Sequence, residues 1–388
     1  MKFIDLFCGI GGFHQAVKRA VPNAECVMAC DINKDSRQVY ADNYGIQPLE
    51  DIRKIVVSEI PAFDILCAGF PCQAFSNAGK KKGTSDSRGQ LFQYIINIIR
   101  FHNPKFLFLE NVSHLKNIDK GKIYKDILNE LDMVGYSVVV TELSPHQLGV
   151  PQQRKRLVFS CVRKDISKGE SLTIPIPSID ISFDKIFEKT PDPVYTIPSD
   201  ILEVLSAWDE MIQVVEVGEK LSPTILCHEF YRDYTDSEYE ALPAWKKDYI
   251  TKNRRIYLKY KEQWDAWYAK HSALLQKREI YGKLEWQTGV KAEGDSIFNH
   301  FIQLRQSGIR VKRARYFPTL VAIVQVPIYG AQKRYITPRE CARLQSFPED
   351  FKIHAKDRVA YKQFGNAVNV DIIHHVIEAT LYLIHKSC

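Results

Sequence analysis

Short apolar runs alternate with helical patterns from residue 1 to about residue 165, and this alternation constrains the fold more than any other feature. Period and composition predict strands at 3–7, 25–30, 63–68, 105–109, 136–143 and 156–163. They predict helices at 13–21, 91–101 and 123–133. Continuous apolar strands that alternate with helices indicate a mostly parallel sheet covered on both faces. We therefore expect an α/β fold with a Rossmann-like, doubly wound, mostly parallel sheet.

Chemically capable residues fall at the ends of these predicted strands, where such sheets bind their ligands. Gly9 lies in a glycine-rich turn whose spacing is not G-x-G-x-x-G. With Asp31, about 20 residues on, it suggests an adenosine-containing cofactor and not a dinucleotide. Cys72 follows Pro71 at the end of an apolar run, a position that suits a nucleophile. The alternative is a buried, inert cysteine, which is what most cysteines are.

Two further strand ends add charge to this edge of the sheet. Glu110 follows the strand at 105–109, where it is either a functional carboxylate or a helix cap. Arg154 and Arg156 stand two residues apart before an apolar strand, so both are expected on one face, unless they belong to a solvated charge run. A thiol, a carboxylate and two arginines on neighbouring strand ends form a plausible site for an electron-poor anionic substrate.

The composition sets weaker limits. A net charge of +7 fits an anionic partner but does not require one. Nine cysteines without a C-x-x-C pair argue against a disulfide framework and a zinc site, and for a reducing compartment. We expect no metal. Asp5 interrupts any signal-like stretch, and we expect no apolar run long enough to span a membrane. These features predict a cytoplasmic location.

The character of the chain changes near residue 168, where prolines punctuate a linker-like segment up to Pro198. From about 201 to 290 the chain is helical in pattern, aromatic and charged, and holds all five tryptophans. Lys246 to Lys261 interleaves basic and aromatic residues, and Ser307 to Arg315 is a second basic cluster. Thr337-Pro338 begins another helix. We expect a domain at 1–180, a second, smaller domain at 181–335, and a segment at 336–388 that returns to the first.

Seven sequence patterns now stand in a fixed order along the chain. They are DLFCGIGGF (5–13), Asp31, GFPCQAFS (69–76), ENV (110–112), QQRKRL (152–157), RECARLQSFP (339–348) and QFGNAV (363–368). In this order they resemble the DNA (cytosine-5)-methyltransferases of bacterial type II restriction-modification systems. The resemblance covers about residues 1–165 and 310–388. It does not cover the middle, where that family carries a variable target recognition domain.

The resemblance implies a mechanism. Cys72 would attack C6 of a cytosine flipped out of duplex DNA, and so activate C5 for methylation. Glu110 would supply a proton at N3, for which a raised pKa is useful. Arg154 and Arg156 would stabilise charge on the base and position its carbonyl and nearby phosphates. The methyl donor would be S-adenosyl-L-methionine, which leaves as S-adenosyl-L-homocysteine.

The resemblance also implies binding residues. Those expected to bind the cofactor are Phe7, Gly9, Gly11, Asp31, Ile32, Asp51, Ile52, Pro71, Leu91, Asn366, Ala367 and Val368. Those expected to contact DNA are Lys80, Lys81, Lys82 and Arg88 in a closing loop, and Arg310, Arg313 and Arg315 in the recognition domain. Of these, Arg313 or Arg315 is expected to read a base. The partner is double-stranded DNA, the protein is expected to be a monomer, and a cognate restriction endonuclease is a possible functional partner. No membrane is involved.

Three rival interpretations remain. A tRNA cytosine-5 methyltransferase of the same fold would carry Pro-Pro-Cys-Gln and a Cys-Phe-Thr signature, whereas this chain has Phe70-Pro71-Cys72-Gln73 and no Cys-Phe-Thr. A catalytically silent DNA-binding homologue is disfavoured by the intact cysteine, glutamate and arginine set. A Rossmann dehydrogenase is disfavoured by the glycine spacing.

Overall fold

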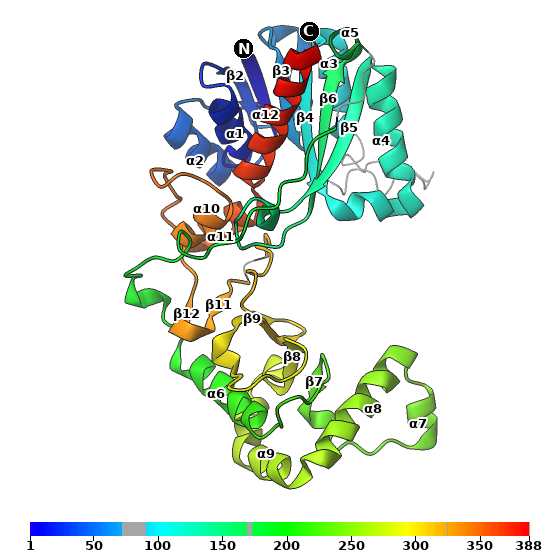
Figure 1. Ribbon diagram of the computed structural model, residues 1–388, viewed down its shortest axis with the longest axis vertical. Helices are drawn as coiled ribbons and strands as arrows, with labels where there is room; N and C mark the ends of the chain where they lie inside the picture. The colour runs from blue at the N-terminus through cyan, green and yellow to red at the C-terminus, as the bar shows by residue number, and fades with distance from the viewer. Residues whose placement is uncertain (72–90, 169–172, 324, 388) are drawn as a thin grey trace. The chain divides into compact units, whose positions relative to one another are not determined.

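A computed structural model describes residues 1–71, 91–168, 173–323 and 325–387 (Figure 1). The chain forms two compact units. Unit 1 comprises Met1–Phe187, Val321–Ile323 and Pro338–Cys388, and unit 2 comprises Glu188–Leu320 and Val324–Thr337. The predicted cysteine nucleophile Cys72 and the loop cations Lys80, Lys81, Lys82 and Arg88 lie outside the described residues.

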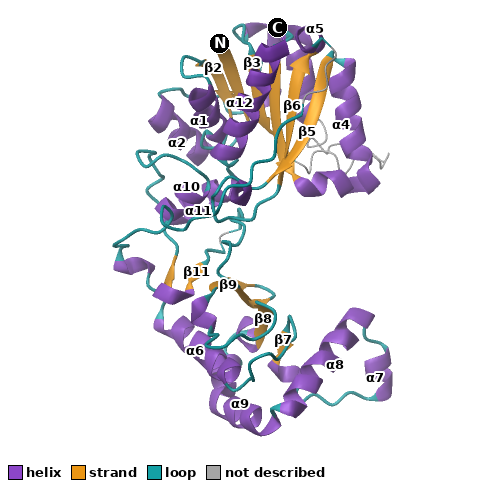
Figure 2. Cartoon of the chain, in the orientation of Figure 1, coloured by secondary structure: helices purple, strands orange, loops and turns teal. Residues whose placement is uncertain are grey.

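A six-stranded sheet forms the centre of unit 1, with strand order β2-β1-β3-β4-β6-β5 (Figure 2). Its strands are β1 (Lys2–Leu6), β2 (Glu25–Cys30), β3 (Ile65–Gly69), β4 (Phe106–Val112), β5 (Tyr136–Leu143) and β6 (Arg156–Arg163). The first four pair in parallel, and β6 runs antiparallel to both β4 and β5. The chain passes from β1 to β2 on one side and then to β3 on the other. This reversal creates the switch point beside β1 at which doubly wound sheets bind ligands.

Helices cover both faces of this sheet, as predicted. The helices of unit 1 are α1 (Gly12–Ala20), α2 (Lys34–Tyr44), α3 (Leu91–His102), α4 (Lys122–Met133), α5 (Lys164–Ser167), α10 (Pro338–Leu344), α11 (Asp357–Asn366) and α12 (Val370–Ser387). On one face, apolar side chains of α3 and α4 pack with Leu66 and Leu107 of the sheet. On the other face α12 packs against α1 and β6, and Ser160 and Thr380 are hydrogen-bonded at 2.6 Å.

The expectation that no segment resembles a membrane span is wrong for one stretch. Asp357–Lys386 has the length and hydropathy of a span. Within it, Val376 and Ile377 of α12 are fully buried in unit 1, so the apolar residues on this face of α12 belong to the core of the unit. A buried core helix and a membrane span share the same composition, and only packing separates them.

The antiparallel direction of β6 matters for the site. Because β6 runs backwards, its first residue lies beside the last residues of its neighbours: Arg156 pairs with Val112 of β4 and Leu143 of β5. This pairing carries β4 on to Val112. Glu110 and Asn111 therefore lie at the carboxyl end of the strand, as expected, and their side chains point to opposite faces.

Unit 2 combines helices with a second six-stranded sheet, in the order β12-β11-β9-β10-β8-β7. Its helices are α6 (Ser199–Gln213), α7 (Asp236–Glu240), α8 (Ala244–Lys259) and α9 (Lys261–Leu275). Its strands are β7 (Ile225–Leu226), β8 (Lys283–Gln287), β9 (Phe301–Arg305), β10 (Gly308–Lys312), β11 (Ile328–Tyr329) and β12 (Arg334–Tyr335). The sequence pattern predicted helices over most of 201–290 and did not reveal β7 or β8.

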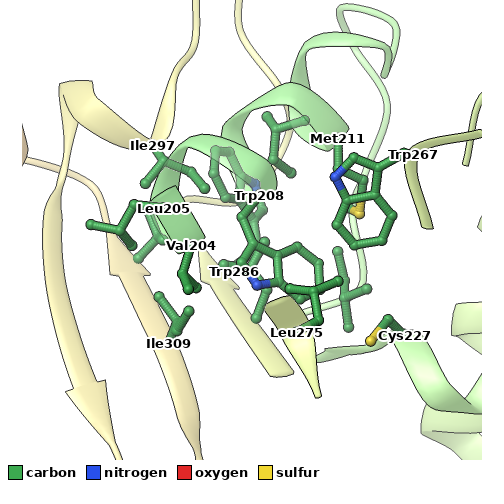
Figure 3. Close-up of a cluster of buried hydrophobic side chains, with 14 of the residues drawn as sticks. Val204, Leu205, Trp208, Met211, Cys227, Trp267, Leu275, Trp286, Ile297 and Ile309 are labelled. Carbon is green, nitrogen blue, oxygen red and sulfur yellow. The ribbon is translucent and has the colours of Figure 1, made fainter. Parts of the chain in front are cut away.

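Tryptophans occupy the core between this sheet and its helices (Figure 3). Trp208, Trp264 and Trp286 are almost fully buried, and the indole N–H of Trp208 donates to the carbonyl of Tyr281 at 2.7 Å. Figure 3 shows Trp286 of β8 and Ile309 of β10 directed at the same cluster as Trp208 of α6. The aromatic character of this region is therefore explained by its core.

Candidate active site

An ion pair between Glu110 and Arg156 lies at the carboxyl edge of the central sheet. Arg156 Nε and Glu110 Oε1 are 2.8 Å apart, and the two side chains are only 15% and 13% exposed. The strand pairing described above sets this contact, because β6 starts where β4 ends. Burial raises the pKa of the Glu110 carboxyl, and the charges of Arg156 and Arg154 oppose that rise. A carboxyl of this kind can retain a proton and donate it to a substrate.

Arg154 occupies a different position from the one expected. Its guanidinium is buried, with the residue 3% exposed, and Nη2 donates to the carbonyls of Gly365 at 2.9 Å and Ala367 at 3.1 Å. Burial and the neighbouring charge of Arg156 lower the pKa of Arg154 to about 9, although Glu110 favours its charged form. The charges of both arginines thus act on Glu110, whereas Nη2 of Arg154 donates to backbone carbonyls of the C-terminal segment, and its contact with phosphates stays a prediction.

Buried amides hold the C-terminal segment against this arginine. Gln345 Nε2 donates to the Phe364 carbonyl at 2.8 Å, and Asn369 Nδ2 donates to the Leu344 carbonyl at 3.2 Å. Gly365 also meets a short segment of the chain from far upstream: a Cβ at this position would lie 2.4 Å from backbone atoms of Val321. Only glycine fits here without displacement. No pattern in the sequence predicts this contact between Val321–Ile323 and Gly365.

Asn111 is a positioning residue that the sequence did not assign. Its Nδ2 donates to the Phe70 carbonyl at 2.9 Å, and the residue is 3% exposed. The contact fixes the chain at the end of β3, two residues before Cys72. The sequence feature that could have indicated this role is its position next to Glu110, because adjacent residues of a strand point to opposite faces of the sheet.

The glycine-rich turn after β1 contains glycines with distinct tasks. Gly9 has φ +54°, and a Cβ there would meet no atom within 4 Å, so its backbone faces open space. A Cβ at Gly11 would lie 2.2 Å from the Tyr44 ring, and one at Gly12 would lie 2.5 Å from Val368. Gly9 is therefore the point where a ligand can approach the backbone, whereas the other two glycines allow close packing.

Asp31 supports this turn from the end of β2. Its carboxylate accepts from the backbone N–H of Gly9 at 2.8 Å and of Asn33 at 2.7 Å. Burial raises the pKa of Asp31, and these two hydrogen bonds oppose the rise. Helix α1 begins at this turn with no side-chain cap and no acidic residue in its first turn. An open glycine, a half-buried carboxylate and an uncapped helix N-terminus fit a ligand with hydroxyl groups and a carboxylate, as S-adenosyl-L-methionine has.

The other expected cofactor residues lie in varied surroundings. Asp51 forms a two-point pair with Arg53, and this hydrogen bonding lowers the pKa of Asp51. Ile32 is 73% exposed, whereas Ile52 is 5% exposed and belongs to the core. Four of the remaining residues are exposed or partly exposed: Phe7, Pro71, Leu91 and Asn366. The other two, Ala367 and Val368, are buried. Val368 lies 3.8 Å from the position of a Cβ on Gly69, as does Glu110 Oε2, so these expected cofactor and catalytic residues meet at the end of β3.

A buried polar and aromatic cluster that was not predicted from the sequence lies next to the glycine-rich turn. The His14 ring stacks on Tyr44 with centroids 3.9 Å apart, and His14 Nδ1 is hydrogen-bonded to the Tyr40 hydroxyl at 2.8 Å. Tyr44 in turn donates to the Gly11 carbonyl at 3.0 Å. Asp5 is fully buried, and its Oδ1 has no hydrogen-bond partner among the described residues. Burial raises the pKa of Asp5 and lowers the pKa of His14 to about 4.

The expected DNA-contacting residues of unit 2 are on or next to β10. Arg310 donates from Nε to Glu285 Oε2 at 2.6 Å. Arg313 is exposed and donates to the Thr288 carbonyl at 2.7 Å, and Arg315 is exposed over the ring of Tyr316. Across the described parts of the chain, no group of three or more His, Cys, Asp or Glu side chains is placed to hold a metal ion. The seven cysteines in those parts are free.

Comparison with known proteins identifies the family. The sequence pattern of the family described as C-5 cytosine-specific DNA methylase matches residues 1–381. The type II methyltransferase M.HhaI of Haemophilus parahaemolyticus is 31% identical over 379 residues, which cover 97% of this chain and 93% of the relative. The type II methyltransferase M1.ScrFI of Lactococcus lactis subsp. cremoris is 34% identical over 391 residues, covering 100% of this chain and 79% of the relative.

Solved structures agree on the fold. The Dnmt2 methyltransferase of S. pombe has a TM-score of 0.55 at 18% identity, covering 99% of each chain. A DNMT2 variant of Spodoptera frugiperda has a TM-score of 0.58 at 19% identity, covering 98% of this chain and 99% of the other. The predicted family and α/β fold are confirmed, and this chain belongs to the C-5 cytosine-specific DNA methylase family.

Proposed function

We propose that this protein methylates C5 of cytosine within a specific sequence of duplex DNA, in the cytoplasm, as the modifying half of a type II restriction-modification system. The observation that carries the proposal is the largely buried Glu110–Arg156 pair, because a carboxyl with a raised pKa beside a guanidinium matches the N3 and O2 edge of cytosine. The family and the type II relatives support the same substrate. The protein acts as a monomer in this proposal, because one chain supplies all the residues of the site. A cognate restriction endonuclease is its functional partner.

Each residue has a distinct task in this mechanism. The thiolate of Cys72 adds to C6, while Glu110 gives a proton to N3, so the ring becomes an enamine that is nucleophilic at C5. S-adenosyl-L-methionine, when bound at Gly9 and Asp31, supplies the methyl group. Arg156 stabilises charge at the base carbonyl, and Arg154 holds the turn at Gly365 in place. Loss of the C5 proton, elimination of the Cys72 thiolate and return of the N3 proton to Glu110 then release the neutral methylated base.

Unit 1 carries the reaction in this proposal, and unit 2 selects the target sequence. We assign the region at 181–335 as the target recognition domain, and the closing loop cations Lys80, Lys81, Lys82 and Arg88 as contacts to the DNA backbone. Flipping the cytosine out of the duplex requires a few kcal/mol, because its stacking and base pairing are lost, and these contacts offset that free energy.

Methyl transfer from labelled S-adenosyl-L-methionine to duplex DNA and to tRNA tests the proposal. We expect label on duplex DNA alone, with Cys72→Ser inactive and cofactor affinity within a few fold of wild type. A duplex that contains 5-fluorocytosine should trap a covalent adduct on Cys72, because fluorine cannot leave as a proton does. Label on tRNA instead of duplex DNA would overturn the substrate assignment. An adduct on another cysteine would overturn the assignment of the nucleophile.

A further inference from the structure

The two faces of the sheet in unit 2 differ in character. Ile309 and Val311 of β10 are fully buried in the core that contains Trp286, which Figure 3 shows beside Ile309. Side chains alternate along a strand, so Arg310 and Lys312 lie on the opposite face. The sheet pairing places Arg310 between Glu285 of β8 and Gln303 of β9, both at most 6% exposed. The face away from the core is therefore polar and positively charged.

Arg310 is held in a defined orientation on this face. Its Nε donates to Glu285 Oε2 at 2.6 Å, and the same carboxylate oxygen lies 3.6 Å from Arg305. Neither Nη group of Arg310 makes a hydrogen bond to any described residue. The Arg310 side chain is 29% exposed, whereas that of Glu285 is 9% exposed. A buried carboxylate thus holds one edge of the guanidinium and leaves its two-pronged end open to a ligand.

Lys312 adds a second cation to the same face. Burial, reinforced by the charge of Arg310, lowers the pKa of Lys312. None of the ion pairs among the described residues includes it. Arg305 and Arg310 share the buried carboxylate of Glu285, and Lys312 has no ion-pair partner among the described residues, so this partly desolvated surface carries an excess of positive charge. Such a surface favours an electron-rich partner.

The basic helix α8 is arranged differently. Lys252 pairs with Asp248 at 2.6 Å, Arg255 with Glu219 at 3.2 Å, and Lys259 with Glu216 at 2.7 Å. Lys247 pairs with Glu240 at 2.8 Å. Acids within unit 2 therefore neutralise these four cations of α8. The excess charge lies on β10 and in the segment that follows it.

On this basis, and resting on the proposed function, we propose that Arg310 is a specificity-determining residue that reads a guanine of the target sequence. Its open Nη pair can donate two parallel hydrogen bonds to O6 and N7 in the major groove, the commonest specific contact between protein and DNA. Glu285 positions this pair by accepting from Nε, and Lys312 strengthens the attraction of the face for DNA. The exposed Arg313 and Arg315 then contact phosphates, in place of the base reading expected of them.

A library of duplexes with randomised windows around cytosine, read by bisulfite sequencing after methylation, tests this assignment. Wild type should show a preferred site that contains a fixed guanine. Arg310→Ala should lose the preference at that one base pair and methylate the preferred site about 5- to 150-fold more slowly. Arg310→Lys keeps the charge but lacks the planar fork, so it should show the same loss. Arg255→Ala, which removes another arginine paired with a glutamate in unit 2, should keep the wild-type profile.

The outcomes separate this inference from the proposed function. An unchanged sequence profile in Arg310→Ala would overturn the inference, whether its rate falls uniformly or not at all. Recovery of the wild-type profile by Arg310→Lys would also overturn it, because a phosphate contact requires only charge. If tryptophan fluorescence shows that Arg310→Ala does not fold, the sequence profile of Arg310→Lys alone tests the inference. Wild type that methylates no duplex would overturn the proposed function together with this inference.

Discussion

The stability of unit 1 should depend on pH through His14. Its ring is 7% exposed, stacks on Tyr44 and is hydrogen-bonded to the Tyr40 hydroxyl. Burial lowers the pKa of His14 from 6.5 to about 4. Between these two values the unfolded chain binds a proton that the folded chain excludes. The free energy of unfolding therefore falls as the pH falls from about 6.5 to about 4.

The magnitude follows from the shift. Folded and unfolded pKa values of about 4 and 6.5 correspond to a loss of ~3 kcal/mol once the pH lies below both values. Relative to pH 7.5, integration between the two pKa values gives a loss of about 1 kcal/mol at pH 5.5 and of about 2–3 kcal/mol at pH 4.5. His14→Phe keeps the aromatic stacking but cannot titrate, so this share of the acid sensitivity should disappear.

Asp5 supplies a comparison of opposite sign. Burial raises the pKa of Asp5, so the folded chain holds a proton that the unfolded chain releases. Its stabilising contribution is fully present below about pH 4 and is lost as the pH rises towards the folded pKa. Asp5→Asn should therefore make the loss of stability on acidification steeper, whereas His14→Phe should make it shallower.

Hydrogen–deuterium exchange of peptides from β1 and α1, corrected for intrinsic rates at each pH, measures this stability. Tryptophan fluorescence cannot serve, because all five tryptophans lie between residues 208 and 286, in unit 2. It provides the control instead: the urea midpoint of unit 2 should not differ among the three proteins. Equal pH slopes in wild type and His14→Phe would refute the reasoning, since His14 would then titrate alike in the folded and unfolded chains.

Other changes test the site directly. Asp31→Ala should weaken binding of S-adenosyl-L-methionine by ~1–3 kcal/mol, because it leaves the Gly9 amide unpaired; unaltered affinity by calorimetry would make Asp31 a structural residue only. Glu110→Gln should reduce kcat by about 10²- to 10⁴-fold while cofactor affinity stays constant, because glutamine cannot give up a proton at N3; wild-type kcat would exclude that role. Gly365→Ala should lower the free energy of unfolding of unit 1 by ~1–3 kcal/mol, because its Cβ would lie 2.4 Å from the Val321 backbone. Hydrogen–deuterium exchange rates near Gly365 equal to those of wild type would contradict this close contact.

The fold was largely accessible from local patterns. Apolar runs of strand length and the helical periods between them depend on side chains close in sequence, and the predicted strand at 25–30 coincides with β2. The continuation of β4 to Val112 was not accessible in this way, because it depends on pairing with β6, some 46 residues later. The strands of unit 2 were harder to predict from the sequence, because β7 and β8 are short and lie among helices.

The sequence by itself identified the chemistry: which residue types stand at strand ends, in which order, and to which family that order belongs. Tertiary structure decided what each group can reach. Arg154 and Arg156 look equivalent in the sequence, yet one is enclosed by backbone carbonyls and the other pairs with Glu110. The basic residues of α8 and of β10 also look alike, but acids of α8 itself and of segments outside it neutralise the first set, and Glu285 of β8 fixes Arg310 of the second. Charge and hydrogen bonding act through space, so the partners that decide a residue's role are set by packing and not by its neighbours in the chain.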